Sequence, residues 1–193
     1  MGSPSVAEPA PPSLSLAASS APERASASAL ATTSGSAAVD PPLLPQTRDR
    51  PEASGAAFEG RVSALWDAIV ADDPPRALPF FFPLGAYRQV KDVADPAADW
   101  NRRLVAAYSR DIHALHARLG DGGSGSAKLV GLDVPQERAR WVEPGQEYNK
   151  IGYYRVFGSR LHYTMDGEPH VIEVKSLISW RGEWYVVHLS AIK

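Results

Sequence analysis

The chain has 193 residues, with 20 basic side chains, 22 acidic side chains and no cysteine. This length suits one compact domain with an additional segment. The formal net charge of -2 gives no electrostatic basis for binding nucleic acid, and the lack of cysteine excludes disulfides and thiolate metal ligands. No apolar run approaches the roughly 18 residues that cross a bilayer, so we expect no transmembrane segment. We also find no sequence motif that predicts a metal or another cofactor.

Residues 1–57 are rich in alanine, serine and proline and contain no aromatic residue. Such a segment cannot bury enough apolar surface to offset the backbone entropy lost on folding, so it is predicted to be disordered. We interpret it as a tail or linker; a tether and a docking peptide at Asp40–Pro51 are the alternatives. The folded domain is predicted to span residues 58–193. The compartment stays open between the cytoplasm and an exported, periplasmic location with the leader removed.

The first half of this domain has helical periodicity. Apolar residues recur at helical spacing from Phe58 to Val70, and this helix is expected to end at Asp72. Asp73 then serves as the N-cap of a short second helix. That helix leads into three adjacent aromatic residues, Phe80–Phe82, which we expect to close one end of the core.

The longest predicted helix begins at Asp95, whose carboxylate is expected to cap it, and ends at Gly120. His113 and His116 lie three residues apart on this helix, but no third ligand follows at the spacing of a zinc motif. We therefore interpret both as surface imidazoles. The glycine-rich stretch Gly120–Ala127 lacks the lysine of a phosphate-binding loop and is predicted to be a flexible connector.

The stretch from Arg138 to Ile192 is predicted to be a sheet of consecutive hairpins, preceded by a short strand at residues 127–135. Three turn signals divide it, namely Gly158-Ser159, Asp166-Gly167 and Arg181-Gly182. If each turn has two residues, the register follows by counting. The expected pairs are Phe157–Arg160, Met165–Glu168, Leu161–Ile172, Arg160–Glu173, Trp180–Glu183, Ile178–Tyr185, Ser176–Val187 and Lys175–His188.

Because side chains alternate along a strand, this register sorts them onto two faces of the sheet. The apolar face is predicted to contain Tyr154, Val156, Leu161, Tyr163, Ile172, Val174, Ile178, Tyr185, Val187 and Leu189. The opposite, polar face is predicted to contain Tyr153, Arg155, Arg160, His162, Glu173, Lys175, Ser179, Trp184 and His188. The amphipathic helices are the available cover for the apolar face, so we expect an α+β fold with N-terminal helices packed on a curved antiparallel meander.

The element order and the closing hairpin "VKSLISWRGEWYVVHLS" resemble the nuclear-transport-factor-2-like superfamily, which includes SnoaL-like proteins, in a bacterial member. The resemblance covers about residues 58–193 and implies a cone-shaped α+β domain; cystatin-like folds are the nearest rival. That superfamily contains isomerases, dehydratases and many non-enzymatic binding domains, so the fold alone does not select a function. Its enzymes commonly place an Asp or His inside the cone. The predicted inner face has no such carboxylate, which favours binding over catalysis.

We therefore interpret the domain as a non-enzymatic binding or interaction module. In one version a small apolar ligand sits inside the cone. The residues predicted to line that site are Tyr154, Tyr163, Ser176, Tyr185 and Phe81. These tyrosines could equally fill the core and bond one another.

A second version places a protein partner or a second copy of the chain on the polar face. The residues predicted for that contact are Arg155, Arg160, His162, Glu173, Lys175, Trp184 and His188. A solvated face with cross-strand charge pairs is the alternative. Phe157 and Trp184 on this face suggest a homodimer contact. The remaining function class is an isomerase or dehydratase with His162, His170 or His188 as base beside a tyrosine.

Overall fold

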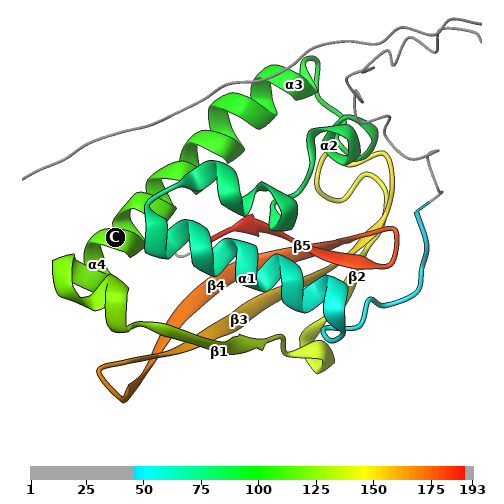
Figure 1. Ribbon diagram of the computed structural model, residues 1–193. Helices are drawn as coiled ribbons and strands as arrows, with labels where there is room; N and C mark the ends of the chain where they lie inside the picture. The colour runs from blue at the N-terminus through cyan, green and yellow to red at the C-terminus, as the bar shows by residue number, and fades with distance from the viewer. Residues whose placement is uncertain (1–45, 190–193) are drawn as a thin grey trace, which may run out of the picture. The chain divides into compact units, whose positions relative to one another are not determined.

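The computed structural model describes residues 46–189, which form an α+β domain with its helices before its sheet (Figure 1). The predicted fold class is confirmed, whereas the predicted disorder of residues 1–45 lies outside the described residues. The helical elements are α1 (Ala56–Ala71), the 3-10 helix η1 (Pro74–Phe80), α2 (Leu84–Val90), α3 (Pro96–Asp99), the π-helix η2 (Trp100–Val105) and α4 (Ala106–Ser126). The strands are β1 (Lys128–Asp133), β2 (Arg140–Val142), β3 (Tyr153–Met165), β4 (Glu168–Trp180) and β5 (Glu183–His188), and the 3-10 helix η3 (Gln136–Arg138) lies between β1 and β2.

Helix α1 forms where the apolar periodicity predicts it and ends at the aspartates. Phe58, Val62 and Leu65 are buried on its inner face. Asp72 adopts a left-handed conformation with φ 53°, which terminates the helix. His113 Nδ1 lies 2.6 Å from Asp72 Oδ1 and therefore ties α4 to the end of α1.

The long predicted helix is interrupted. Asp95 caps α3 as expected, because its Oδ1 accepts a hydrogen bond of 2.9 Å from the Ala98 backbone N–H. The backbone then follows π geometry through Trp100–Val105 before α4 begins. Gly120 has non-helical angles, φ 72° and ψ 167°, yet helical backbone resumes after it and continues to Ser126. The helix thus breaks at Gly120, but the predicted flexible connector is wrong for most of its length.

The five strands form one antiparallel sheet in the order β1-β3-β4-β5, and β2 also pairs with β3. The turn at Asp166-Gly167 is confirmed, with positive φ at both residues and Met165 opposite Glu168. The turn at Arg181-Gly182 is confirmed in the same way. These two turns fix the meander of β3, β4 and β5.

The third predicted turn is wrong, because β3 runs straight through Gly158-Ser159. Phe157 pairs with Ser176 of β4 rather than with Arg160, and Ser159 pairs with Val174. Gly158 takes a φ of 74° inside the strand, which its lack of a Cβ permits. Glycine here accommodates an irregular strand rather than a reversal of the chain.

A bulge changes the register between β4 and β5. Ser176 pairs with His188, whereas counting from the turn predicted Val187 as its partner and paired Lys175 with His188. The register shifts between Ser176 and Leu177 because an extra residue enters β5. The predicted two faces also hold only in part, because Tyr153, Ser179 and Trp184 are buried although they were assigned to the polar face.

Residues 46–55, assigned to the tail by composition, form a strap that contacts the sheet (blue to cyan in Figure 1). Gln46 Nε2 donates to the Ser179 carbonyl at 3.0 Å, and its Oε1 accepts from the Arg181 N–H at 2.6 Å. The indole N–H of Trp184 donates to the Pro51 carbonyl at 3.0 Å. The folded domain therefore begins at least twelve positions before residue 58.

Two arginines of the strap lie over aromatic rings. The guanidinium carbon of Arg48 is 4.8 Å from the centre of the Trp141 ring, and that of Arg50 is 5.7 Å from the Tyr154 ring. Such cation-π contacts attach a polar segment to a sheet with little apolar burial. In the described part of the chain, no helix is long and apolar enough to cross a membrane.

Candidate functional site

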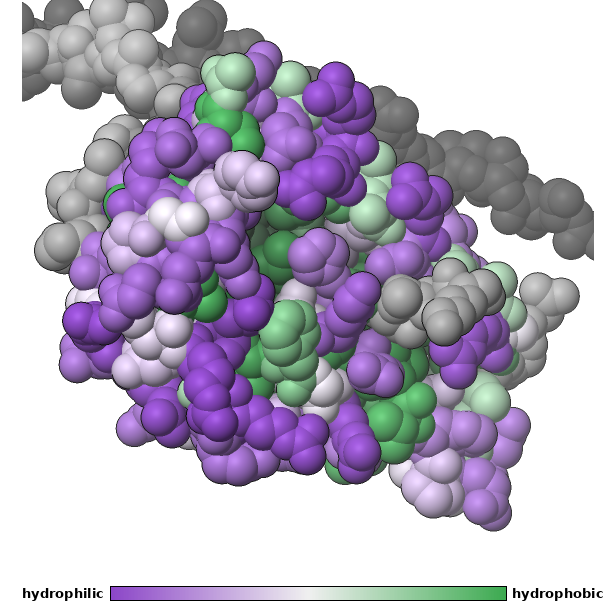
Figure 2. All heavy atoms as spheres, turned by 180° about the vertical axis from the view of Figure 1, so that it is seen from behind, coloured by the Kyte–Doolittle hydropathy of each residue, from purple (hydrophilic) through white to green (hydrophobic). Residues whose placement is uncertain are grey.

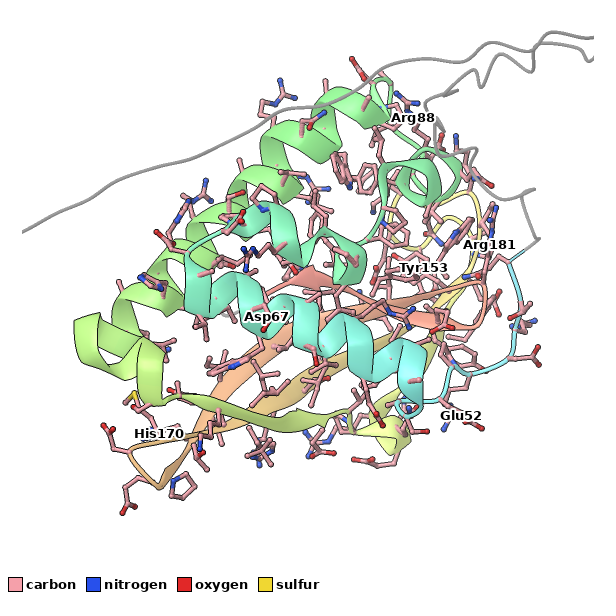
Figure 3. All side chains as sticks on the ribbon, viewed as in Figure 1. Glu52, Asp67, Arg88, Tyr153, His170 and Arg181 are labelled. Atoms are coloured by element: carbon pink, nitrogen blue, oxygen red, sulfur yellow. The ribbon has the colours of Figure 1, made fainter. Side chains whose placement is uncertain are left out.

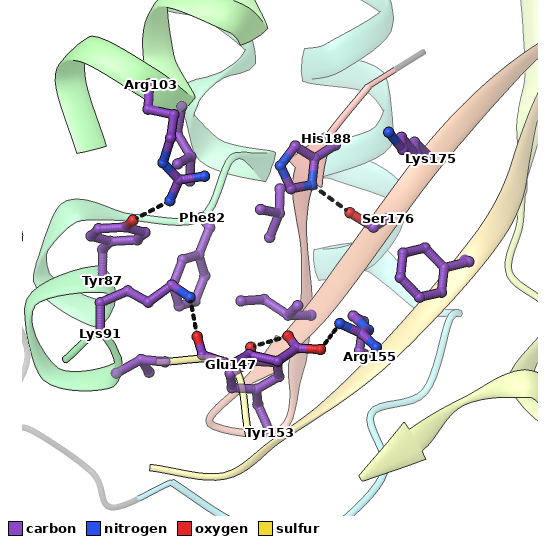
Figure 4. Close-up of a pocket in the computed structure, with 15 residues that line it drawn as sticks. Phe82, Tyr87, Lys91, Arg103, Glu147, Tyr153, Arg155, Lys175, Ser176 and His188 are labelled. Atoms are coloured by element: carbon purple, nitrogen blue, oxygen red, sulfur yellow. Dashed lines mark hydrogen bonds and ion pairs between the residues drawn. The ribbon is translucent and has the colours of Figure 1, made fainter. Parts of the chain in front are cut away.

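A pocket of about 200 Å³ lies between the C-terminal half of the sheet and the segment from η1 to η2 (Figure 4). Strands β3, β4 and β5 supply one wall; α2, η2 and the loop between β2 and β3 supply the other. The lining residues are Phe82, Tyr87, Val90, Lys91, Arg103, Leu104, Glu147, Tyr153, Arg155, Phe157, Lys175, Ser176, Ile178, Val187 and His188.

The interior of the pocket is apolar and its edges are polar. Phe82, Val90, Leu104 and Ile178 are buried hydrophobic residues that line it. Figure 2 shows a hollow of this character on the face turned away in Figure 1, with hydrophobic atoms at its floor and hydrophilic residues around it. Such a distribution of polarity is typical of sites for small molecules.

Four cationic side chains converge on the pocket from four elements. Lys91 follows α2, Arg103 comes from η2, Arg155 from β3 and Lys175 from β4 (Figure 4). Lys91 and Arg155 are half-buried, whereas Arg103 and Lys175 are exposed. Glu147 is the one carboxylate among the lining residues of this pocket in the described chain. The pocket is therefore positively charged.

Glu147 connects several of these groups (Figure 4). Its carboxylate accepts a hydrogen bond of 2.7 Å from the Tyr153 hydroxyl and forms an ion pair with Arg155. Its backbone carbonyl accepts a hydrogen bond of 2.7 Å from Lys91 Nζ. The side chain of Lys91 forms no ion pair with any residue in 46–189. Burial, followed by the charges of Arg103 and Arg155, lowers the pKa of the Lys91 ammonium.

Asn149 holds the loop that carries Glu147. This buried side chain donates from Nδ2 to the carbonyls of Glu143 and Ile151, each at 3.0 Å, and accepts from the Glu147 N–H at 2.8 Å. Every polar group of the amide is thereby engaged, which fixes the loop although Tyr148 within it is 79% exposed. Asn149 thus positions Glu147 without lining the pocket.

The opposite wall contains a hydrogen-bonded triad of Tyr87, Asp99 and Arg103. Arg103 Nη2 donates to the Tyr87 hydroxyl at 2.7 Å and to Asp99 at 3.0 Å, and the Tyr87 hydroxyl donates to Asp99. Burial, with a contribution from Asp99, raises the pKa of Tyr87 to about 12. The hydrogen bonds from Arg103 and Tyr87 lower the pKa of Asp99. Arg103 lies within the π-helix, a geometry that is frequent at functional sites.

His188 and Ser176 form the polar pair at the sheet side. Ser176 Oγ lies 2.9 Å from His188 Nδ1, a contact that the bulge makes possible by pairing these residues across β4 and β5. Burial and the nearby charges of Lys175, Arg103 and Lys91 lower the pKa of His188 below its ordinary value of 6.5. The imidazole is therefore neutral at pH 7.

Of the five residues predicted for the ligand site, only Ser176 lines this pocket in the described structure. Phe81 instead stacks on Tyr108 at 4.2 Å, and its neighbour Phe82 lines the pocket. Tyr163 packs against Trp66 of α1. Tyr154 lies under Arg50 of the strap, and Tyr185 lies 5.3 Å from the guanidinium carbon of Arg61.

The predicted partner face divides into three groups. Arg155, Lys175 and His188 line the pocket, and Phe157 joins them with Arg155 4.6 Å above its ring. Trp184 has an exposed fraction of 0%, so it cannot form a surface patch with Phe157. The sheet keeps Arg160 opposite Glu173 and His162 opposite Val171, as a polar row outside the pocket lining.

The structure also separates the other candidate residues from the pocket. His170 lies near the β3–β4 turn, far along the sheet from Tyr153 (Figure 3). His116 Nδ1 contacts the Ile69 carbonyl at 3.0 Å, and His113 contacts Asp72. No group of three or more potential metal ligands occurs among the described residues.

Most of the polar lining was missed by the sequence reasoning. Short elements or loops without hydrophobic periodicity contain Tyr87, Lys91 and Glu147. No sequence motif in this chain predicted the π-helix that contains Arg103. Tyr153 was assigned to the polar face because the predicted turn at Gly158-Ser159 put it out of phase with Leu161, whereas β3 continues with unbroken register and keeps the two residues in phase. Their convergence is a property of the tertiary fold.

Comparison of the chain with protein-family models, curated proteins and solved structures finds no match. The resemblance to the nuclear-transport-factor-2-like superfamily therefore stays an expectation. The chemistry of the pocket is the basis for assigning a function.

Proposed function

We propose that this domain is a small-molecule binding module and that the pocket between η2 and strands β3, β4 and β5 is its ligand site. The observation that carries the proposal is the concave site of about 200 Å³ with an apolar interior and convergent polar groups. Pockets for drug-sized ligands begin at about 300 Å³, so the ligand is a smaller molecule. This proposal keeps the function class expected from the sequence and places the ligand beside different residues.

The test combines ligand detection with a variant that fills the pocket. Native mass spectrometry of the full chain should detect a complex of the protein with a co-purified small molecule (the bound species). Denaturation should release this molecule from the protein, and small-molecule analysis then identifies it. Val187→Phe adds an aromatic ring at the lining and should abolish that species. Val171→Phe is the matched control, because Val171 lies in the same sheet, is 46% exposed and is outside the pocket.

Equal retention of the species by Val187→Phe and Val171→Phe would contradict the proposed site. Circular dichroism and thermal unfolding of both variants verify that the fold is intact. If only Val187→Phe loses the species while both fold, the ligand occupies this pocket.

An isomerase or dehydratase is the second candidate, and the contact between His188 and Ser176 favours it. A neutral imidazole beside a pocket can remove a proton from a bound carbonyl compound. If Nδ1–H donates to Ser176 Oγ, then Nε2 carries the lone pair that a base requires. Tyr153, whose pKa burial raises to about 12, remains protonated and able to donate a hydrogen bond.

Proton exchange tests this second candidate without knowledge of the natural substrate. The protein is incubated in deuterated water with small ketones, and nuclear magnetic resonance follows loss of the protons next to the carbonyl. Exchange that requires His188, and that is lost in His188→Gln while binding persists, supports an enzyme. Exchange at the uncatalysed rate for every ketone rejects it and leaves the binding module.

A further inference from the structure

The cationic side chains that line the pocket outnumber the carboxylates around it. This holds even when two nearby acids outside the lining, Asp99 and Asp111, are counted. Four cationic side chains line it beside Glu147. Asp99 forms an ion pair with Arg103. Asp111 lies near Lys175: burial raises the pKa of Asp111, and the positive charge of Lys175 lowers it by a smaller amount. One cation thus remains in excess, and it lies in a partly water-excluded site where charge interactions are strengthened.

Lys91 and Arg155 are the two half-buried cations of the pocket, and of these Lys91 forms no ion pair with a described residue. Its half-buried ammonium has three donor hydrogens, and the described residues provide one acceptor, the neutral carbonyl of Glu147 at 2.7 Å. A buried ammonium without a carboxylate is unfavourable in a folded protein. Phe82 and Val90 add apolar surface around the same space. The arrangement is suited to an anion that arrives with an apolar body.

Glu147 indicates which anion fits. Its carboxylate already pairs with Arg155 and accepts the Tyr153 hydroxyl, so the chain itself places a carboxylate at this position of the pocket. A carboxylate with one negative charge can accept two parallel hydrogen bonds from the Arg155 guanidinium, and removing its water shell costs less free energy than for a dianion. The apolar lining would penalise a strongly hydrated phosphate.

We propose that the ligand is a small carboxylic acid with an apolar body, whose carboxylate is bound by Lys91 and Arg155 in competition with Glu147. This inference rests on the proposed function, because it names the chemical class of the molecule in the same pocket. The apolar body lies against Phe82 and Leu104. Lys175, which forms no hydrogen bond or ion pair with another residue in 46–189, attracts the anion at the mouth of the pocket.

The experiment compares two matched ligand series in the full chain. Straight-chain carboxylates from butanoate to decanoate are titrated calorimetrically, and the corresponding primary amides serve as neutral equivalents of equal size. We expect the best carboxylate to bind about tenfold more tightly than its amide, because a hydrogen bond to a charged group contributes about 1.5–3 kcal/mol. Added salt should lower the affinity for the carboxylate and leave the affinity for the amide unchanged.

Variants assign the preference to named residues. Lys91→Met should remove the advantage of the carboxylate, and Lys175→Met should reduce it about twofold to threefold because that lysine is exposed. Glu147→Gln should increase the affinity for the carboxylate, because the competing charge is lost. Lys128→Met, an exposed lysine of β1 outside the pocket, is the matched control and should change neither series. Thermal unfolding of each variant verifies folding.

The outcomes separate the two proposals. Equal affinity for acids and amides overturns the carboxylate assignment and keeps the small-molecule site. A preference that survives Lys91→Met overturns the placement of the carboxylate at Lys91. No binding of any acid or amide to the natural sequence, with no co-purified species, overturns both. A stronger response of Lys128→Met than of Lys91→Met would place the anion elsewhere.

Discussion

At the scale of single residues, His188 makes the pocket sensitive to pH. Its pKa lies below 6.5 because of burial and of the charges of Lys175, Arg103 and Lys91, so it is neutral at pH 7 and gains a proton only in more acidic solution. Its other polar neighbours are Ser176 at Nδ1 and, across the pocket, Glu147 and Arg155. A protonated His188 adds one positive charge to the lining.

Carboxylate affinity should therefore rise as the pH falls below 6.5, as long as the ligand stays ionised. Titration calorimetry over this range measures the effect, and His188→Gln should remove it. The amide series is the control, because its affinity should not follow the charge of His188. A pH dependence that persists in His188→Gln would assign the titration to another group.

Tyr87 gives a second prediction, at alkaline pH. Its pKa is raised from 10.0 to about 12, so between these values the folded state keeps a proton that the unfolded state has lost. The free energy of unfolding must then decrease as the pH rises through this window. Thermal unfolding should show a shallower alkaline loss of stability in Tyr87→Phe than in the natural sequence. Identical slopes would contradict the raised pKa.

At the scale of elements, the loop between β2 and β3 depends on one amide. Asn149→Ala removes three hydrogen bonds, including those to the Glu147 N–H and the Ile151 carbonyl, which should cost about 3 kcal/mol of unfolding free energy. The Glu143 carbonyl still accepts from the Gln146 N–H at 3.2 Å. Chemical denaturation measures the loss. Tyr148→Ala, in the same loop and 79% exposed, should change stability by less than about 0.5 kcal/mol. Equal effects would show that the amide does not fix the loop.

Local signals predicted elements well and their relative placement poorly. The Asp166-Gly167 turn and the Asp95 cap depend on neighbouring residues, so the sequence predicted them correctly. Gly158 has the same local signal as a turn residue, but the long pairing of β3 with β4 overrides it. The bulge at Ser176 has no local signal, yet it brings His188 to Ser176. Periodicity therefore could not predict the pocket.

At the scale of the whole molecule, the strap makes the boundary of the domain testable. A chain beginning at residue 58 loses the Pro51 carbonyl that accepts from Trp184 and both hydrogen bonds of Gln46 to the β4–β5 turn region. The indole N–H, buried in the intact domain, would lose its partner, at a cost of about 1–3 kcal/mol. Thermal unfolding should therefore give a clearly lower midpoint for residues 58–193 than for residues 46–193. Equal midpoints would make the strap dispensable.

The π-helix at Trp100–Val105 has a consequence for insertions and deletions. A π turn closes its hydrogen bonds one residue later than an α turn, so it accommodates an extra residue. Deleting Arg102, which is exposed and outside the pocket lining, would let the segment relax to α geometry. The flanking helical segments would then keep their relative orientation, and Trp100 would keep the contact of 2.8 Å between its indole N–H and the Phe82 carbonyl. A deletion within regular α geometry would instead rotate one side of the helix by about 100°. We therefore expect the fold to tolerate deletion of Arg102 better than deletion of a residue within the α-helical part of α4, with thermal unfolding as the measurement.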